Sequence, residues 1–148
     1  MKLILAAHGM LAEEVVNSAG MVFGQIEDLA VVTFVPGENA ETLKAKYKEI
    51  IDGYADDSEI LFLVDLFGGS PYNAAFETVM EQDRMDVITG LSLPMLIDVV
   101  GIRTMEESIK AKEVINKLSD ETYIKSCKQL LAGTENETEE EDELWKLI

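Results

Sequence analysis

The chain has few of the residues that build disulfides, metal sites and nucleic-acid interfaces. A single cysteine, Cys127, excludes an internal disulfide, and no second thiol or histidine lies near it in the sequence, so we expect no zinc site. Only 12 basic residues stand against 29 acidic ones, which argues against nucleic acid as a partner because nucleic-acid binding needs a basic stripe.

Long hydrophobic runs are also missing. None approaches the roughly 20 residues of a membrane span, and the N-terminal stretch "MKLILAAHGM" is too short for a secretory signal. We therefore expect a cytoplasmic protein without membrane insertion and without a metal or other cofactor.

The composition fits one globular domain. The 148 residues are 47% hydrophobic, and a domain of this size can bury a substantial core. The run 135–143 holds seven acidic residues and no basic one, and without it the net charge changes from −17 to −10. We assign 1–133 to the domain and 134–148 to an acidic tail. The acidity could steer a partner with a basic face toward the protein, or it could serve solubility alone.

Strand-like and helix-like segments alternate along the chain. Short β-branched or apolar runs predict strands, and apolar residues at helical spacing predict helices. The predicted strands are 2–7, 29–35, 59–65 and 85–90; the predicted helices are 11–24, 41–54, 70–80, a short one at 93–100 and a longer one at 105–118. Ser70 is the expected N-cap of its helix, with Pro71 in the first helical position. The segment 122–131 reads equally as a strand or a helix.

This alternation predicts an α/β fold, a doubly wound and mainly parallel sheet with helices on both faces. A common strand order for such sheets is 2-1-3-4, and ligands bind where the order reverses, beyond the carboxyl ends of the strands. His8, the only histidine, follows the first strand, and Asp65 follows the third. The two side chains should therefore flank one crevice.

Each candidate residue has a chemical use there. A carboxylate that accepts a hydrogen bond from one imidazole nitrogen leaves the other nitrogen free to attack, which suits His8 and Asp65 to nucleophilic catalysis. The helix N-termini after Gly9 and Gly69, with Ser70, offer N–H groups and positive partial charge to a phosphoryl group. Each residue also has a structural explanation, such as a turn or a cap. No "GKS" or "GKT" is present, so a nucleotide-binding Walker loop is excluded.

Several motifs together resemble one family. "AAHGMLAEEVVNSAGMVFG", "FVPGENAETLKAKY", "LFLVDLFGGSPYNAA" and "VITGLSLPML" are similar, in order and spacing over residues 1 to about 100, to the mannose-family enzyme IIA component of the bacterial phosphoenolpyruvate-dependent sugar phosphotransferase system. The acidic run after Gly133 departs from the family pattern.

The resemblance implies a phosphotransferase mechanism and a set of partners. It implies that His8 accepts a phosphoryl group from the phosphohistidine of the carrier protein HPr and passes it to a IIB component, for coupled sugar uptake and phosphorylation. It also implies that Asp65 hydrogen-bonds the imidazole, that Ser70 lies at the phosphoryl site, and that a C-terminal strand, here within 122–131, joins two copies in a homodimer. Two alternatives stay open: a phosphodonor subunit of a dihydroxyacetone kinase, and a regulatory domain that binds a small ligand without chemistry.

Overall fold

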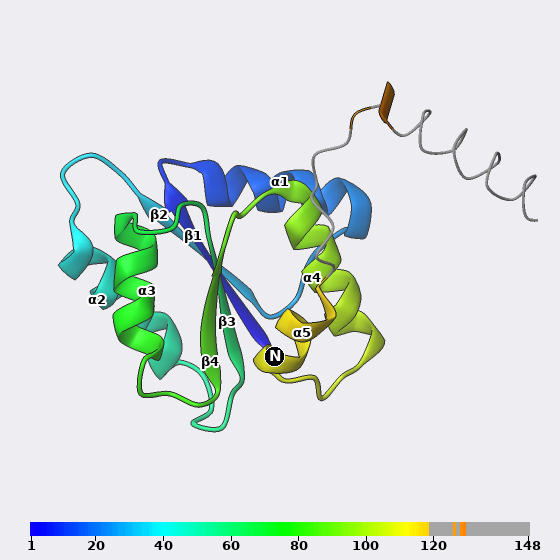
Figure 1. The fold of residues 1–148 in the computed structure, drawn as a ribbon. Helices are drawn as coiled ribbons and strands as arrows, with labels where there is room; N and C mark the ends of the chain where they lie inside the picture. The colour runs from blue at the N-terminus through cyan, green and yellow to red at the C-terminus, as the bar shows by residue number, and fades with distance from the viewer. Residues whose placement is uncertain (119–125, 127, 130–148) are drawn as a thin grey trace, which may run out of the picture. The chain divides into compact units, whose positions relative to one another are not determined.

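The protein, seen here in a computed structural model, is a parallel sheet between two layers of helices (Figure 1). The structure describes residues 1–118, 126, 128 and 129. The predicted tail, and all but three residues of the ambiguous segment 122–131, lie outside them. In chain order the elements are β1 (Lys2–His8), α1 (Leu11–Phe23), β2 (Leu29–Phe34), α2 (Ala40–Asp52), β3 (Ile60–Val64), α3 (Ser70–Val79), β4 (Met85–Thr89), α4 (Leu93–Met105) and α5 (Ala111–Lys117).

The strand order is the predicted one, β2-β1-β3-β4, and every pairing is parallel. The strands are short and apolar, and β3 is buried along its whole length, as expected when both faces of a sheet are covered. The order reverses between β1 and β3. The carboxyl ends of these two strands therefore lie next to each other.

Alternate side chains of the strands enter two separate cores. One core joins Leu3 and Leu5 of β1 to α1, α4 and α5. The other joins Ile4 and Ala6 of β1 to α2 and α3. In Figure 1 the two groups of helices lie on opposite sides of the sheet. Both cores are apolar, with no buried polar or charged residue among those described, and they supply a packed base for the loops at the strand ends.

The prediction for Ser70 was wrong. The N-cap of α3 is Gly69, whose backbone is extended (φ −73°, ψ 166°), and Ser70 is the first residue of the helix. The reason is the neighbouring histidine: a Cβ on residue 69 would lie 3.0 Å from Cε1 of His8. The capping position therefore holds a residue without a side chain, a tolerated N-cap, and the serine enters the first turn.

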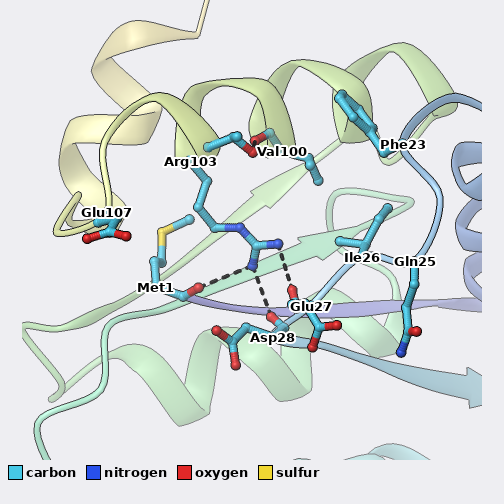
Figure 2. Close-up of a pocket in the computed structure, with 10 residues that line it drawn as sticks. Met1, Phe23, Gln25, Ile26, Glu27, Asp28, Val100, Arg103 and Glu107 are labelled. Carbon is cyan, nitrogen blue, oxygen red and sulfur yellow. Dashed lines mark hydrogen bonds between the residues drawn. The ribbon is translucent and has the colours of Figure 1, made fainter.

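The predicted lengths of the last two helices were also wrong. Helix α4 runs to Met105, and α5 covers only Ala111–Lys117. Ser92 caps α4 by accepting the N–H of Met95. Near the other end of α4, Arg103 donates to the carbonyls of Met1 (3.2 Å), Glu27 (2.7 Å) and Asp28 (3.0 Å), as Figure 2 shows. These bonds hold the last turn of α4 against the amino ends of β1 and β2, so the helix continues past the expected end.

The same Arg103 lines a cavity of about 390 Å³ at the amino ends of the strands. His8 lies at the carboxyl end of β1, so this cavity is at the opposite edge of the sheet from the histidine. No helix in the described part of the chain is long and apolar enough to cross a membrane.

Candidate active site

The imidazole of His8 and the carboxylate of Asp65 meet at the edge where the strand order reverses. His8 is the last residue of β1, and Asp65 directly follows β3. The distance from Nδ1 of His8 to Oδ2 of Asp65 is 2.8 Å. The histidine side chain is 45% exposed whereas that of the aspartate is 9% exposed. The ring is thus accessible to another molecule while its partner is shielded.

Asp65 accepts hydrogen bonds from three N–H groups. Its Oδ2 atom accepts from the backbone N–H of His8 (3.0 Å) as well as facing Nδ1, and its Oδ1 atom accepts from the backbone N–H of Leu66 (2.9 Å). Burial raises the pKa of Asp65, but the hydrogen bonds and charge of His8 and the bond from Leu66 outweigh it, so the pKa lies below its ordinary value of 3.8. The carboxylate is therefore ionised at neutral pH.

An ionised carboxylate can only accept hydrogen bonds, which fixes the arrangement of protons on the imidazole. Nδ1 must be the donor, so in the neutral ring Nε2 carries the lone pair. That nitrogen is the one free to act as a nucleophile.

The three other predicted site residues follow the ends of the same two strands: Gly9 and Gly69 lie in the connecting segments, and Ser70 begins α3. Gly9 follows β1 with φ 59°, and its N–H donates to the carbonyl of Phe34 (2.7 Å). The N–H of Gly69 donates to the carbonyl of Leu66 (3.2 Å). In contrast, neither the hydroxyl nor the backbone N–H of Ser70 has a hydrogen-bond partner within the described part of the chain.

The sequence reasoning missed one neighbour of the imidazole. The ring of Phe34, the last residue of β2, lies perpendicular to that of His8, with centroids 5.5 Å apart and an interplanar angle of 76°. His8 and Phe34 are paired in the strand register. The motif "FVPGEN" contains this phenylalanine, but the motif alone does not show that the two rings touch.

Apolar side chains are exposed in the turns that carry the site. Met10, Leu66 and Phe67 are 50%, 59% and 78% exposed. The ring of Phe67 contacts Tyr72, which in turn stacks near Phe76 on α3. Exposed apolar side chains gathered in this way are typical of surfaces that bind other proteins.

No group of three or more potential metal ligands occurs among the residues that the structure describes.

Known proteins share both the sequence and the fold. Residues 2–118 match the family described as "PTS system fructose IIA component", EIIA-man. The chain is 37% identical over 145 residues to the "PTS system fructose-specific EIIA component" of Bacillus subtilis (strain 168), covering 95% of this chain and 97% of that protein. It is 39% identical over 106 residues to the "PTS system mannose-specific EIIAB component" of Escherichia coli (strain K12), covering 72% of this chain but only 33% of that protein.

A solved structure agrees. The PTS IIA protein associated with the fucose utilization operon of Streptococcus pneumoniae superimposes with a TM-score of 0.72 at 27% identity, covering 88% of this chain and 95% of that one. With the family matched over residues 2–118, the chain belongs to the mannose-type EIIA family of the phosphotransferase system (PTS), whose members are phosphotransferases that carry a phosphohistidine intermediate.

Proposed function

We propose that the protein is a cytoplasmic phosphocarrier of a sugar PTS, which takes a phosphoryl group from phospho-HPr onto His8 and passes it to a IIB component. One observation carries the assignment to His8: it is the only histidine of the chain, and its exposed ring is bonded through Nδ1 to a shielded carboxylate. A phosphohistidine intermediate in this chain can form nowhere else.

The mechanism of phosphoryl transfer follows from the position of the proton on Nδ1 of His8, which leaves the lone pair on Nε2. The lone pair on Nε2 attacks the phosphorus of phospho-HPr, the new N–P bond forms, and the N–P bond to the HPr histidine breaks and returns its electron pair to that nitrogen. The proton on Nδ1 stays in its bond to Asp65 throughout. Positive charge that develops on the attacking ring is stabilised by this carboxylate 2.8 Å away. In the transfer to IIB, a nucleophile of IIB attacks the phosphorus, and the N–P bond to Nε2 of His8 breaks and returns its electron pair to that nitrogen.

Among the predicted phosphoryl ligands, we assign direct binding to Ser70 and conformational roles to the glycines. The hydroxyl and N–H of Ser70 are free within the described residues and lie in the first turn of α3, where the helix dipole favours a negative group. The N–H groups of Gly9 and Gly69 are already bonded to carbonyls. Gly9 supplies a positive φ, and Gly69 supplies the space beside the imidazole.

The exposed apolar side chains in the two turns, Met10, Leu66 and Phe67, support docking of a protein rather than a small ligand. They accompany the imidazole on the turns that carry it, so a partner that covers them is brought to Nε2. HPr and IIB must both reach the same nitrogen, and we propose that they use this surface in turn.

A homodimer is a further part of the proposal, implied by the family resemblance. Strand β4 ends the sheet, and its outer edge has no strand beside it among the described residues, so it could accept the strand expected within 122–131. Sedimentation velocity at micromolar concentration tests this: two copies in one species are expected, and a monomer would contradict it.

A phosphate-labelling experiment tests the carrier function. The protein is incubated with phosphoenolpyruvate, enzyme I and HPr, and label that is lost in acid but kept in base is expected on the wild type. His8→Ala should carry no label while its circular dichroism stays that of a folded domain. Label that persists in this variant would show that His8 is not the acceptor.

The same labelling separates the other functions. A ligand-binding regulatory domain would take up no covalent phosphate from any donor. A pull-down that recovers a dihydroxyacetone-kinase subunit and no IIB protein would instead indicate that the protein is the phosphodonor subunit of a dihydroxyacetone kinase.

Asp65→Asn provides the next test, because the amide has no negative charge to stabilise the imidazole, and either orientation places its NH₂ group against a backbone N–H, that of His8 or that of Leu66. Transfer to this variant should slow by about 10²- to 10⁴-fold, by analogy with the aspartate of serine proteases. An unchanged rate would remove the role given to Asp65.

A further inference from the structure

The loop 35–39, "VPGEN", is tied to its surroundings by the carboxylate of Glu38 and the ammonium group of Lys46, in addition to the capping box that Asn39 forms with Thr42. Oε1 of Glu38 accepts the backbone N–H of Val35 (2.9 Å), and Oε2 pairs with Nζ of Lys46 (2.6 Å). The same Nζ atom donates to the carbonyl of Thr33 (2.9 Å). The Glu38 side chain is only 17% exposed, so this ion pair is partly shielded from water.

These bonds fasten the chain on both sides of Phe34. Thr33 precedes the phenylalanine and Val35 follows it, so the backbone at Phe34 has little freedom to move. The carbonyl of Phe34 also accepts the N–H of Gly9 (2.7 Å), which joins the end of β2 to the residue after His8. The ring of Phe34 is thereby held in place against the imidazole.

The imidazole needs such a contact. The backbone fixes Cβ of His8 and a hydrogen bond holds Nδ1, but a hydrogen bond tolerates a range of lengths and angles, so small rotations about the two side-chain torsions remain. Such rotations move Nε2, the atom that must meet the phosphorus. Gly69 lies against Cε1 and Phe34 is nearly perpendicular to the ring, so these two neighbours can limit the rotations.

We propose that Phe34 is a positioning residue for the phosphoryl acceptor, and that the Glu38–Lys46 ion pair acts through it by holding the end of β2. This inference rests on the proposed function, because it concerns the aim of Nε2 of His8 at the incoming phosphorus. Phe34 does not touch the phosphoryl group. It sets the direction in which the nucleophile points, and reactions of this kind depend steeply on alignment.

The central experiment compares Phe34→Leu with Phe34→Tyr. Leucine keeps an apolar side chain for the partly buried contact with the core of α2 and α3 but has no ring, whereas tyrosine keeps the ring. At saturating phospho-HPr, Phe34→Leu should transfer about 10- to 100-fold more slowly, since misplacement by about 1 Å can cost 10²-fold. The concentration of phospho-HPr at half-maximal rate should stay unchanged, and Phe34→Tyr should recover most of the rate.

A matched control is available on α1. Phe23 is 41% exposed and lies at the end of α1 farthest from His8, so Phe23→Leu makes the same chemical change away from the site. It should transfer at the wild-type rate. The unfolding midpoints of all variants show whether a slower rate reflects loss of folded protein.

A second measurement does not depend on phosphoryl transfer. Because the chain has one histidine, its ring gives one set of NMR signals. In Phe34→Leu the nitrogen shifts should report the same tautomer, since Asp65 is intact, while ¹³C relaxation of the ring should show greater motion. Glu38→Gln should shift the relaxation in the same direction by a smaller amount, and Lys46→Arg should keep the wild-type value.

The outcomes distinguish this inference from the proposed function. If the wild type takes no label, the phosphocarrier proposal fails and the NMR comparison alone decides whether Phe34 orders the ring. If the wild type is labelled, the inference is overturned by a leucine variant with wild-type ring order, by one with the wild-type rate, or by a tyrosine variant as slow as the leucine variant.

Discussion

Gly69 leaves room for the imidazole because it has no side chain. A Cβ at this position would lie 3.0 Å from Cε1 of His8 and 3.4 Å from the carbonyl oxygen of Leu66. In Gly69→Ala one of these neighbours must move, and the exposed ring yields more easily than the backbone. We predict that phosphoryl transfer slows by about 10- to 100-fold although the domain stays folded, measured by labelling rate and circular dichroism.

Gly20→Ala is the control for that substitution. Gly20 lies within α1, and nothing comes within 4 Å of a Cβ built there. The change should raise the free energy of unfolding by about 0.4–1 kcal/mol because alanine loses less conformational freedom in a helix, and it should leave transfer unchanged. Equal rates in Gly69→Ala and Gly20→Ala would contradict the role given to Gly69.

The lowered pKa of Asp65 makes the stability of the fold depend on pH. In the unfolded chain the carboxyl of Asp65 has its ordinary pKa of 3.8, and in the folded protein its pKa is lower. The folded state is therefore favoured by this group above pH 3.8, and the contribution is lost as the pH falls through the folded pKa. The difference in unfolding free energy between wild type and Asp65→Asn should shrink as pH is lowered from about 6 to 3, measured by urea unfolding. A difference in unfolding free energy that stays constant over this pH range would contradict the stabilising role of the ionised Asp65.

The pairing of His8 with Asp65 could be predicted because both residues follow apolar runs, and the carboxyl ends of neighbouring parallel strands share one edge. The contact of Phe34 with the ring could not. It depends on which residue of β2 lies opposite His8, and hence on the register, which apolar strands without alternation do not reveal. The missed cap at Gly69 has a similar cause, because the reason for a glycine there is a side chain 61 residues earlier in the sequence.

At the scale of elements, the strands and the first three helices were predicted to within a few residues, and the last two helices were not. Strands β1 to β4 are bounded by clear turn signals, and α2 begins with a capping box at Asn39 and Thr42. The end of α4 is set instead by Arg103, which bonds to carbonyls at the other end of the sequence. Apolar periodicity cannot report a polar contact of this kind.

Arg103 therefore gives a test at this scale. Arg103→Met keeps a long apolar stem but removes the donors to Met1, Glu27 and Asp28. We predict that the free energy of unfolding falls by about 1.5–3 kcal/mol, the range for hydrogen bonds to a charged group. Hydrogen exchange should quicken in the last turn of α4, while transfer to His8, at the other edge of the sheet, should persist. Unchanged exchange there would show that the helix end does not depend on the guanidinium.

For the whole molecule, the fold and the charge act on partners in different ways. The parallel sheet and its two apolar cores hold the strand ends and the helix start that carry His8, Asp65 and Ser70, and the order β2-β1-β3-β4 brings these segments together. The net charge of −17 acts over a longer distance, by attracting a partner with a basic face before contact. Composition alone predicts the charge but leaves two explanations for it, steering and solubility.

Salt dependence separates the two explanations. Raising the ionic strength from about 0.01 to 0.15 M shortens the screening length from roughly 30 to 8 Å. If the charge steers phospho-HPr, the bimolecular rate of labelling should fall steeply over this range, and the rate at saturating donor should not. Changing the seven acidic residues of 135–143 to their amides brings the net charge to −10, which should flatten the salt dependence without changing the saturated rate. If the amide variant keeps the wild-type salt slope but precipitates at lower concentration, the run serves solubility, and steering belongs to the acidic residues of 1–133.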